Sequence, residues 1–125
     1  MKRRHLAQLA VLASLLLATP TLGAEDALLL RVSPKVSNAP AAVVITVTVA
    51  RNEKNRKLVV EDDSESYYRS SEVNLEGENA ARTHRLVFRG LTPGEHRIRA
   101  VVHGTGGFRA TAWETVLVIG AGPAE

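Results

Sequence analysis

The chain has no cysteine, and its only methionine is Met1. Disulfides, a lipid-modified N-terminal cysteine and blue-copper ligation are therefore excluded, and the core alone must stabilise the fold. Aromatic residues make up only 4% of the 125 residues, with a single tryptophan. Long low-complexity runs are also missing, and the charged fraction of 23% is ordinary. The composition therefore predicts a folded chain and not a disordered one.

The first 24 residues have the three-part pattern of a secretory signal peptide. A positive start, Lys2–Arg4, precedes an apolar run over residues 6–18, and small residues follow at Gly23 and Ala24. The apolar run of about 13 residues is shorter than the roughly 20 that a membrane-spanning helix needs. We therefore expect cleavage after Gly23 or Ala24, with an uncleaved anchor as the alternative.

This pattern divides the chain into three parts. We expect a signal peptide helix over residues 1–24, one domain over residues 25–120 and a flexible C-terminal tail over residues 121–125. The protein would then be exported to the periplasm or the extracellular space. Three of the 16 Lys and Arg residues lie in the signal, and the 13 that remain equal the 13 Asp and Glu residues. The mature domain is therefore neutral, which removes the electrostatic argument for nucleic acid.

The mature part reads as a series of short strands separated by turn residues. The clearest is Val43–Arg51, where apolar β-branched residues occupy every second position and predict one buried face. Polar segments such as Asp62–Ser66 are expected loops, and Leu91–Gly94 is an expected tight corner. We expect strands within residues 28–32, 43–51, 56–61, 67–75, 83–89, 95–103 and 110–119. About seven strands without a helix predict two antiparallel sheets packed face to face.

The stretch Leu91–Ala100 carries a resemblance to known families. It resembles the corner before the penultimate strand in fibronectin type III and related immunoglobulin-like sandwiches, with His96 standing nearest to the tyrosine of those families. The residues that match are Leu91, Pro93, Gly94, Ile98 and Ala100. The resemblance implies an all-β, antiparallel immunoglobulin-like β-sandwich of about seven strands. It also implies a role as a binding or spacer module.

Two segments are candidate binding sites. The acidic run around Asp62, Asp63 and Glu65 offers oxygen ligands for calcium, although a solvated turn explains it equally well. Tyr67 and Tyr68, with Trp113, offer a stacking platform for a sugar or peptide. Adjacent residues in a strand point to opposite faces, so only one of the two tyrosines is expected outside, and Trp113 is expected to be partly buried.

A second set of candidates lies in a glycine-rich turn. We interpret it as a hairpin that needs positive φ and as a recognition loop for a partner. Its residues are Gly104, Thr105, Gly106, Gly107 and Phe108.

The arginines and histidines have simpler interpretations. Four arginines repeat at strand spacing and form an anion-binding stripe on one reading: Arg85, Arg89, Arg97 and Arg99. The strand of Arg97 and Arg99 should neighbour the one that carries Lys57 and Glu61, so cross-strand charge pairs also explain them. Arg85 and Arg89 should lie on the other sheet. His96 is expected to point inward as a hydrogen-bonded group, on the opposite face from His103. We expect no metal site and no cofactor.

These observations favour an exported, non-catalytic binding or assembly module of the cell envelope or secreted fraction. It would contact an exported protein partner through loops or a sheet edge. One alternative is a glycan- or calcium-binding module, and a second is a small exported hydrolase, for which no nucleophile motif is present. No nucleic-acid partner and no membrane span after signal cleavage are expected.

Overall fold

The computed structural model describes residues 27–120, so the expected signal peptide and the expected tail at 121–125 lie outside the described residues. The described part is all-β apart from one 3-10 turn, η1 (Gly77–Asn79), as the sequence predicted. It holds eight strands, one more than the seven expected. They are β1 (Leu28–Ser33), β2 (Val36–Asn38), β3 (Ala41–Val49), β4 (Asn55–Ser64), β5 (Tyr67–Asn74), β6 (Thr83–Leu91), β7 (Gly94–Gly104) and β8 (Gly107–Ile119).

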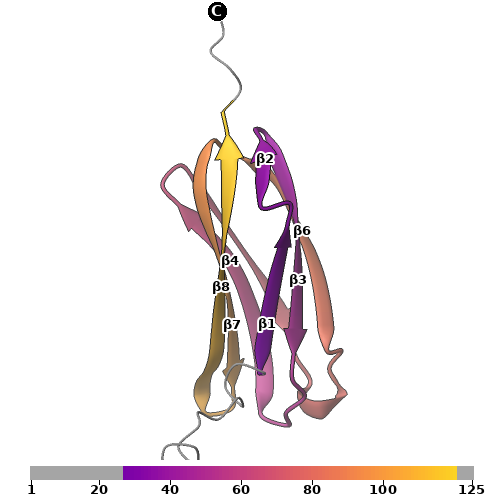
Figure 1. Cartoon of the computed structure of the whole chain (residues 1–125). Helices are drawn as coiled ribbons and strands as arrows, with labels where there is room; N and C mark the ends of the chain where they lie inside the picture. The colour runs from indigo at the N-terminus through magenta and orange to yellow at the C-terminus, as the bar shows by residue number, and fades with distance from the viewer. Residues whose placement is uncertain (1–26, 121–125) are drawn as a thin grey trace, which may run out of the picture.

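The strands form two sheets that pack against each other. One sheet has the order β1-β3-β6 and the other the order β2-β8-β7-β4-β5 (Figure 1). Every neighbouring pair is antiparallel except β2 and β8, which run parallel. Within residues 27–120 no helix has the length and apolar character to cross a membrane.

The strand that the sequence did not reveal is β2. It lies between Pro34 and Pro40, which predicted a break, yet Val36–Asn38 pairs with the end of β8. Backbone N–H groups of Leu117 and Ala39 donate to carbonyls across this pair, each at 2.8 Å. The chain thus leaves the three-stranded sheet after β1, visits the edge of the five-stranded sheet, and returns for β3 (Figure 1). Prolines stop one strand but do not prevent three residues between them from pairing with another.

The core lies between the sheets and follows the predicted alternation. In β3, Val43, Ile45 and Val47 are fully buried, while the residues between them, Val44 and Thr46, are partly exposed. The five-stranded sheet contributes inward residues at the same period from β4, β7 and β8, and Phe88 of β6 is the largest fully buried side chain. Each such side chain contributes about 1.5–3 kcal/mol by leaving water.

The strand β4 is longer than the sequence predicted. Residues 62–66 were expected as a polar loop, but β4 continues to Ser64, and only residues 65 and 66 form the turn. The inward alternation of Leu58 and Val60 continues with Asp62, whose side chain is buried. A carboxylate at an inward position resembles a loop residue in the sequence, and only its partner on another strand explains its place.

The expected corner and hairpin are confirmed. Gly94 has φ +127° and Gly107 has φ +106°, a region that only glycine enters at low cost. These two residues begin β7 and β8, so they set where each strand starts. The side chains described below occupy both faces of those strands.

Candidate functional site

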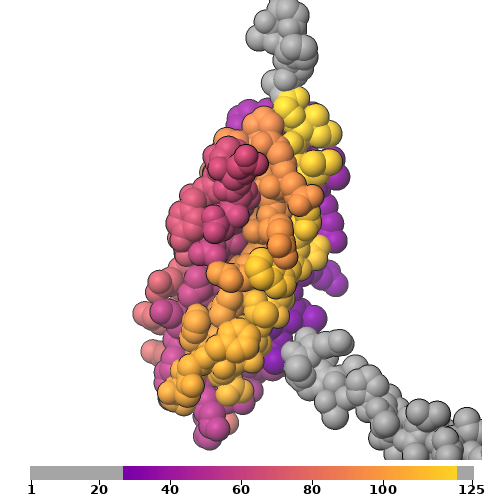
Figure 2. Space-filling model, turned by 90° about the vertical axis from the view of Figure 1, so that its left-hand side faces the viewer, coloured from indigo at the N-terminus to yellow at the C-terminus, as the bar shows by residue number. Residues whose placement is uncertain are grey.

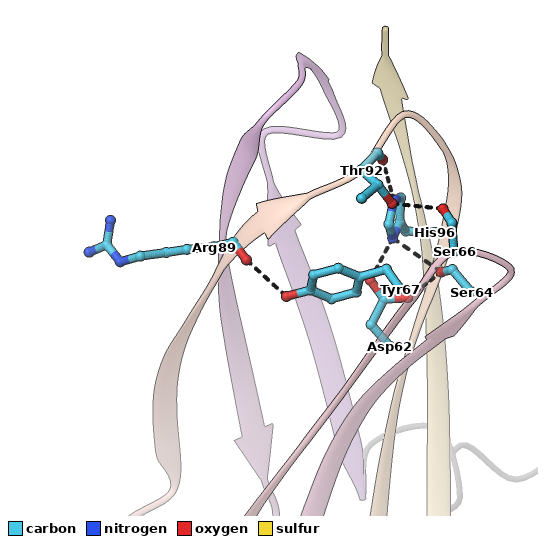
Figure 3. Close-up of polar contacts among 7 residues, drawn as sticks. All are labelled: Asp62, Ser64, Ser66, Tyr67, Arg89, Thr92 and His96. Atoms are coloured by element: carbon cyan, nitrogen blue, oxygen red, sulfur yellow. Dashed lines mark hydrogen bonds and ion pairs between the residues drawn. The ribbon is translucent and has the colours of Figure 1, made fainter.

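A cluster of polar side chains is buried on the inward face of β4 and β7. His96 and Asp62 are 1% and 0% exposed, and 2.6 Å separates His96 Nδ1 from Asp62 Oδ2. On the other side of the ring, His96 Nε2 lies 2.7 Å from the carbonyl oxygen of Thr92 (Figure 3). We call the six residues that take part the inner polar cluster, in which Asp62 and His96 are buried and Ser66 is exposed: Asp62, Ser64, Ser66, Tyr67, Thr92 and His96.

Both ring nitrogens of His96 have partners within the protein. The Thr92 carbonyl and the Asp62 carboxylate are both acceptors, so each ring nitrogen of His96 faces one acceptor. The Ser64 hydroxyl donates to the second oxygen of Asp62 and lies 3.1 Å from His96 Nδ1. The polar groups of this pair are therefore satisfied within the protein. The expectation that His96 points inward as a hydrogen-bonded group is confirmed.

The cluster places Asp, His and Ser together but not in the order that activates a nucleophile. In a hydrolytic triad the serine and the carboxylate bond to different ring nitrogens. Here Ser64 and Asp62 both lie at Nδ1, and the Thr92 carbonyl occupies Nε2. The arrangement therefore supports a structural role and does not support the hydrolase alternative.

The remaining members of the cluster join the two sheets. The Tyr67 hydroxyl donates to the carbonyl of Arg89 at 2.9 Å, which links β5 to β6 of the opposite sheet (Figure 3). The Tyr67 ring meets the His96 ring edge to face, with centroids 5.5 Å apart. Ser66 and Thr92 hydroxyls lie 2.8 Å apart, so the turn after β4 is bonded to the corner before β7.

The outward face of the same strands carries a different set of side chains. Arg99 Nη2 donates to Glu61 Oε1 at 2.6 Å, and the Tyr68 hydroxyl donates to Glu61 Oε2 at 3.2 Å. The guanidinium carbon of Arg97 lies 4.3 Å from the centre of the Trp113 ring, and that of Arg99 lies 5.3 Å from it. The predicted neighbourhood of the two strands, and the charge pair between them, are confirmed.

These side chains line an open hollow of about 230 Å³. We call the five lining residues the Arg–Trp shelf: Glu61, Asp63, Arg97, Arg99 and Trp113. Figure 2 is turned toward the five-stranded sheet, where β5, β4, β7 and β8 run side by side from pink through orange to yellow. Among residues 27–120, no ion pair or side-chain hydrogen bond involves Arg97. Its guanidinium stacks on Trp113 while its N–H groups remain available.

The calcium candidates do not converge. The Asp62 carboxylate points into the core and is bonded to His96, whereas Asp63, the next residue of the same strand, is exposed. Glu65 is exposed in the turn between β4 and β5. No group of three or more His, Cys, Asp or Glu side chains within the described residues is arranged to hold a metal ion.

The aromatic candidates are divided between the two faces, as the sequence predicted for adjacent tyrosines. Tyr67 packs against His96, and Tyr68 is 64% exposed beside Glu61. Trp113 is 47% exposed and lines the shelf. The turn Gly104–Phe108 lies at the other end of β7, so it does not join Tyr68 and Trp113 in one site.

The sequence analysis treated the central residues of the shelf separately. It offered an anion-binding stripe or cross-strand charge pairs for Arg97 and Arg99, and a stacking platform for Trp113. In the structure the β7–β8 hairpin places Trp113 directly opposite Arg99, with Arg97 two residues away on the same face. A register shift between Val102 and His103, which no local pattern marks, brings the three together.

The three described histidines do not form a common site. His96 is inward and fully bonded on β7, and His103 is on the outward face of the same strand, as expected. His84 lies on β6, and its Nε2 is buried without a hydrogen-bond partner. Arg85 and Arg89 share β6 and lie on the other sheet from Arg97, which confirms that prediction.

Comparisons with known proteins find a fold but no family. No family model matches the chain, and no curated protein matches it significantly. Solved structures of superoxide reductase (neelaredoxin) from Ignicoccus hospitalis are similar. One has a TM-score of 0.61 and 12% identity, over 80% of this chain and 88% of that one. Two variants of the same enzyme have TM-scores of 0.60 and 0.58 at 12% identity, over 78% and 73% of this chain and 83% and 78% of theirs.

These matches correct two expectations. The fold resembles that of superoxide reductases, a different β-fold family, so the assignment to immunoglobulin-like or fibronectin type III sandwiches is wrong. It rested on ten residues around a corner, and a Leu-Pro-Gly corner reports local turn geometry and not strand order. The expectation of a non-catalytic binding module, with its glycan, calcium and hydrolase alternatives, is contradicted too, because the similar structures are redox enzymes. At 12% identity the likeness establishes the fold alone.

Proposed function

We propose that this protein binds a small carboxylate ligand on the Arg–Trp shelf. The single observation that carries the proposal is the state of Arg97, which lies 4.3 Å over an exposed tryptophan and has no carboxylate partner among residues 27–120. A guanidinium presents its N–H donors in a planar fork that matches the two oxygens of a carboxylate. Stacking on Trp113 restricts the side chain beforehand, so less conformational entropy is lost when a ligand binds.

The shelf already contains one arginine–carboxylate contact of the kind that we propose for the ligand. Arg99 lies on the same strand and face as Arg97 and bonds to the Glu61 carboxylate at 2.6 Å. A ligand carboxylate on Arg97 would repeat this contact one step along the strand. The hollow of about 230 Å³ suits a small acid. The exposed Asp63 carboxylate lines the same hollow, which disfavours ligands with a dense negative charge.

Export remains part of the proposal. The pattern of residues 1–24 supports a location outside the cytoplasm, periplasmic or extracellular, where the ligand would be met. The neutral charge of the chain after residue 24 offers no support for nucleic acid as a partner. An exported protein partner stays a prediction.

Superoxide reduction receives support from the fold only. Reducing superoxide transfers one electron, which a protein accomplishes through a redox centre held by suitable donor side chains. The described residues do not fit such a centre, because both ring nitrogens of His96 have partners within the core and no three His, Cys, Asp or Glu side chains among residues 27–120 are grouped to hold a metal. No step through a metal is therefore derived for this chain.

The shelf has a built-in reporter, because Trp113 is the only tryptophan in the chain. We would titrate the mature protein with glutarate at constant ionic strength and follow Trp113 fluorescence. Glutaramide, which has a similar length but no charge, is the matched control ligand. We expect glutarate to change the emission to saturation and glutaramide to leave it unchanged.

Two variants make the test specific. Arg97→Gln removes the proposed contact and should weaken binding at least tenfold, whereas Arg85→Gln on the other sheet should leave it unchanged. Equal responses to glutarate and glutaramide, or equal affinity in wild type and Arg97→Gln, would show that the shelf is not a carboxylate site.

A further inference from the structure

A second group of free arginines lies at the end of the molecule where the β3–β4 loop meets the β7–β8 turn. The backbone N–H of Thr105 donates to the carbonyl of Lys54 at 2.9 Å and joins the two segments. Within the loop, Asn52 Oδ1 accepts the Lys54 N–H at 2.8 Å, and Asn55 Nδ2 donates to the Ala50 carbonyl at 3.0 Å. Asn55 is only 4% exposed. The loop is therefore held in one conformation.

Gly104 explains how Arg109 is placed at this end. Gly104 is not among the glycines with positive φ, so its backbone does not require glycine. A Cβ there would lie 2.5 Å from Arg109 Cδ and 2.6 Å from the Lys54 carbonyl oxygen. The absence of a side chain makes room for the stem of Arg109, which packs against the backbone of the turn. The glycine at position 104 thus allows this position of the Arg109 side chain.

Arg109 and Arg51 line the same two hollows, one of about 220 Å³ and one of about 420 Å³. Neither guanidinium takes part in an ion pair or a side-chain hydrogen bond among residues 27–120. The wider hollow is also lined by Glu53 and Glu78, but among residues 27–120 no carboxylate lines the narrower one. Two like charges at one hollow repel each other, and an anion between them removes that repulsion.

We propose that the narrower hollow between Arg51 and Arg109 binds a tetrahedral oxyanion, a phosphate or sulfate group. Two guanidinium groups offer several N–H donors to such a group, as arginines do wherever proteins bind phosphate. Asn52 lines the same hollow, and its Nδ2 group adds a neutral donor. This site is separate from the Arg–Trp shelf and does not depend on the function proposed for it.

Inorganic phosphate is the first probe, and the melting temperature of the mature protein is the readout. Phosphate stabilises many proteins by exclusion from their surfaces, so the comparison of variants at equal ionic strength carries the result. We expect a larger phosphate-dependent rise in Tm for wild type than for Arg51→Gln/Arg109→Gln, with affinity reduced at least tenfold in the double variant. Arg85→Gln, on the other sheet, should behave as wild type.

One further variant and one further ligand distinguish the possible outcomes of this experiment. Arg109→Lys keeps the charge and the stem, so it should retain part of the phosphate response if the double variant loses it. Vesicles of phosphatidylglycerol replace phosphate to distinguish a lipid headgroup from a free oxyanion, with co-sedimentation of wild type and the double variant compared. The site is a headgroup site if only vesicles show a difference and a free-anion site if only phosphate does. Equal behaviour of wild type and double variant in both arms overturns the proposal.

Discussion

The two faces of β4 and β7 carry polar side chains of opposite character. Inward, Asp62 and His96 are buried and bonded to each other and to their neighbours. Outward, one residue along each strand, Asp63 and Arg97 are exposed, and Arg97 has no ion-pair partner among the described residues. Alternation along a strand thus separates a closed polar cluster from an open one. Whether the hydrogen-bond donors already have partners, more than the residue type, distinguishes a structural cluster from a candidate binding site.

The largest expected effect comes from breaking the closed cluster. Asp62→Ala leaves the buried His96 ring without its carboxylate partner, and we expect a loss of about 3–5 kcal/mol in the free energy of unfolding. Urea unfolding followed by circular dichroism measures it. Asp62→Leu with His96→Phe removes both polar groups and should be markedly more stable than Asp62→Ala. A double variant as unstable as the single one would show that the loss of the pair, and not the unpaired ring, determines stability.

A substitution of Arg97 on the outward face should affect ligand binding and not folding. Arg97→Gln removes a stacked but otherwise free cation, so we expect the free energy of unfolding to change by no more than about 1 kcal/mol. Glutarate affinity should fall at least tenfold, which corresponds to about 1.4 kcal/mol. Denaturation and fluorescence titration of the same preparation measure both. A large loss of stability with unchanged affinity would reverse the roles assigned to the two faces.

The smallest expected effects on stability come from the adjacent tyrosines, Tyr67 and Tyr68, whose substitutions by phenylalanine form a matched pair. Tyr67→Phe removes the bond to the Arg89 carbonyl between the sheets, and we expect a loss of about 1 kcal/mol. Tyr68→Phe removes an outward bond to Glu61 from a residue that is 64% exposed, and its effect should stay within about 0.5 kcal/mol. Equal effects in urea unfolding would contradict the division of the two faces.

Much of the fold could be predicted because apolar side chains repeat at the period of a strand. The inward residues of β3 and the order of the strands along the chain followed from local pattern alone. Asp62 could not be placed in this way, since its burial depends on His96, 34 residues away. The short strand β2 was missed for a similar reason, because its pairing partner is at the other end of the domain.

Trp113 shows why the shelf could not be predicted in full. Counting from the turn, Gly104 pairs with Gly107, and this register would place Trp113 opposite the buried Ile98. A one-residue shift between Val102 and His103 instead places it opposite Arg99 on the outward face. A bulge of this kind moves every later side chain of the strand to the other face. The sequence does not mark the bulge, so it could not show that Trp113, which is 47% exposed, lies on the outward face.

The most direct test of the comparison between the faces is a map of where a carboxylate binds. In ¹H–¹⁵N spectra of the mature protein titrated with glutarate, we expect shifts at the Trp113 indole N–H and at the backbone of Arg97 and Arg99. The ring nitrogens of His96 should be unaffected, because both already have hydrogen-bond partners within the inner polar cluster. Shifts at His96, or an unperturbed Trp113 indole at saturating glutarate, would contradict the assignment of a closed inner face and an open outer one.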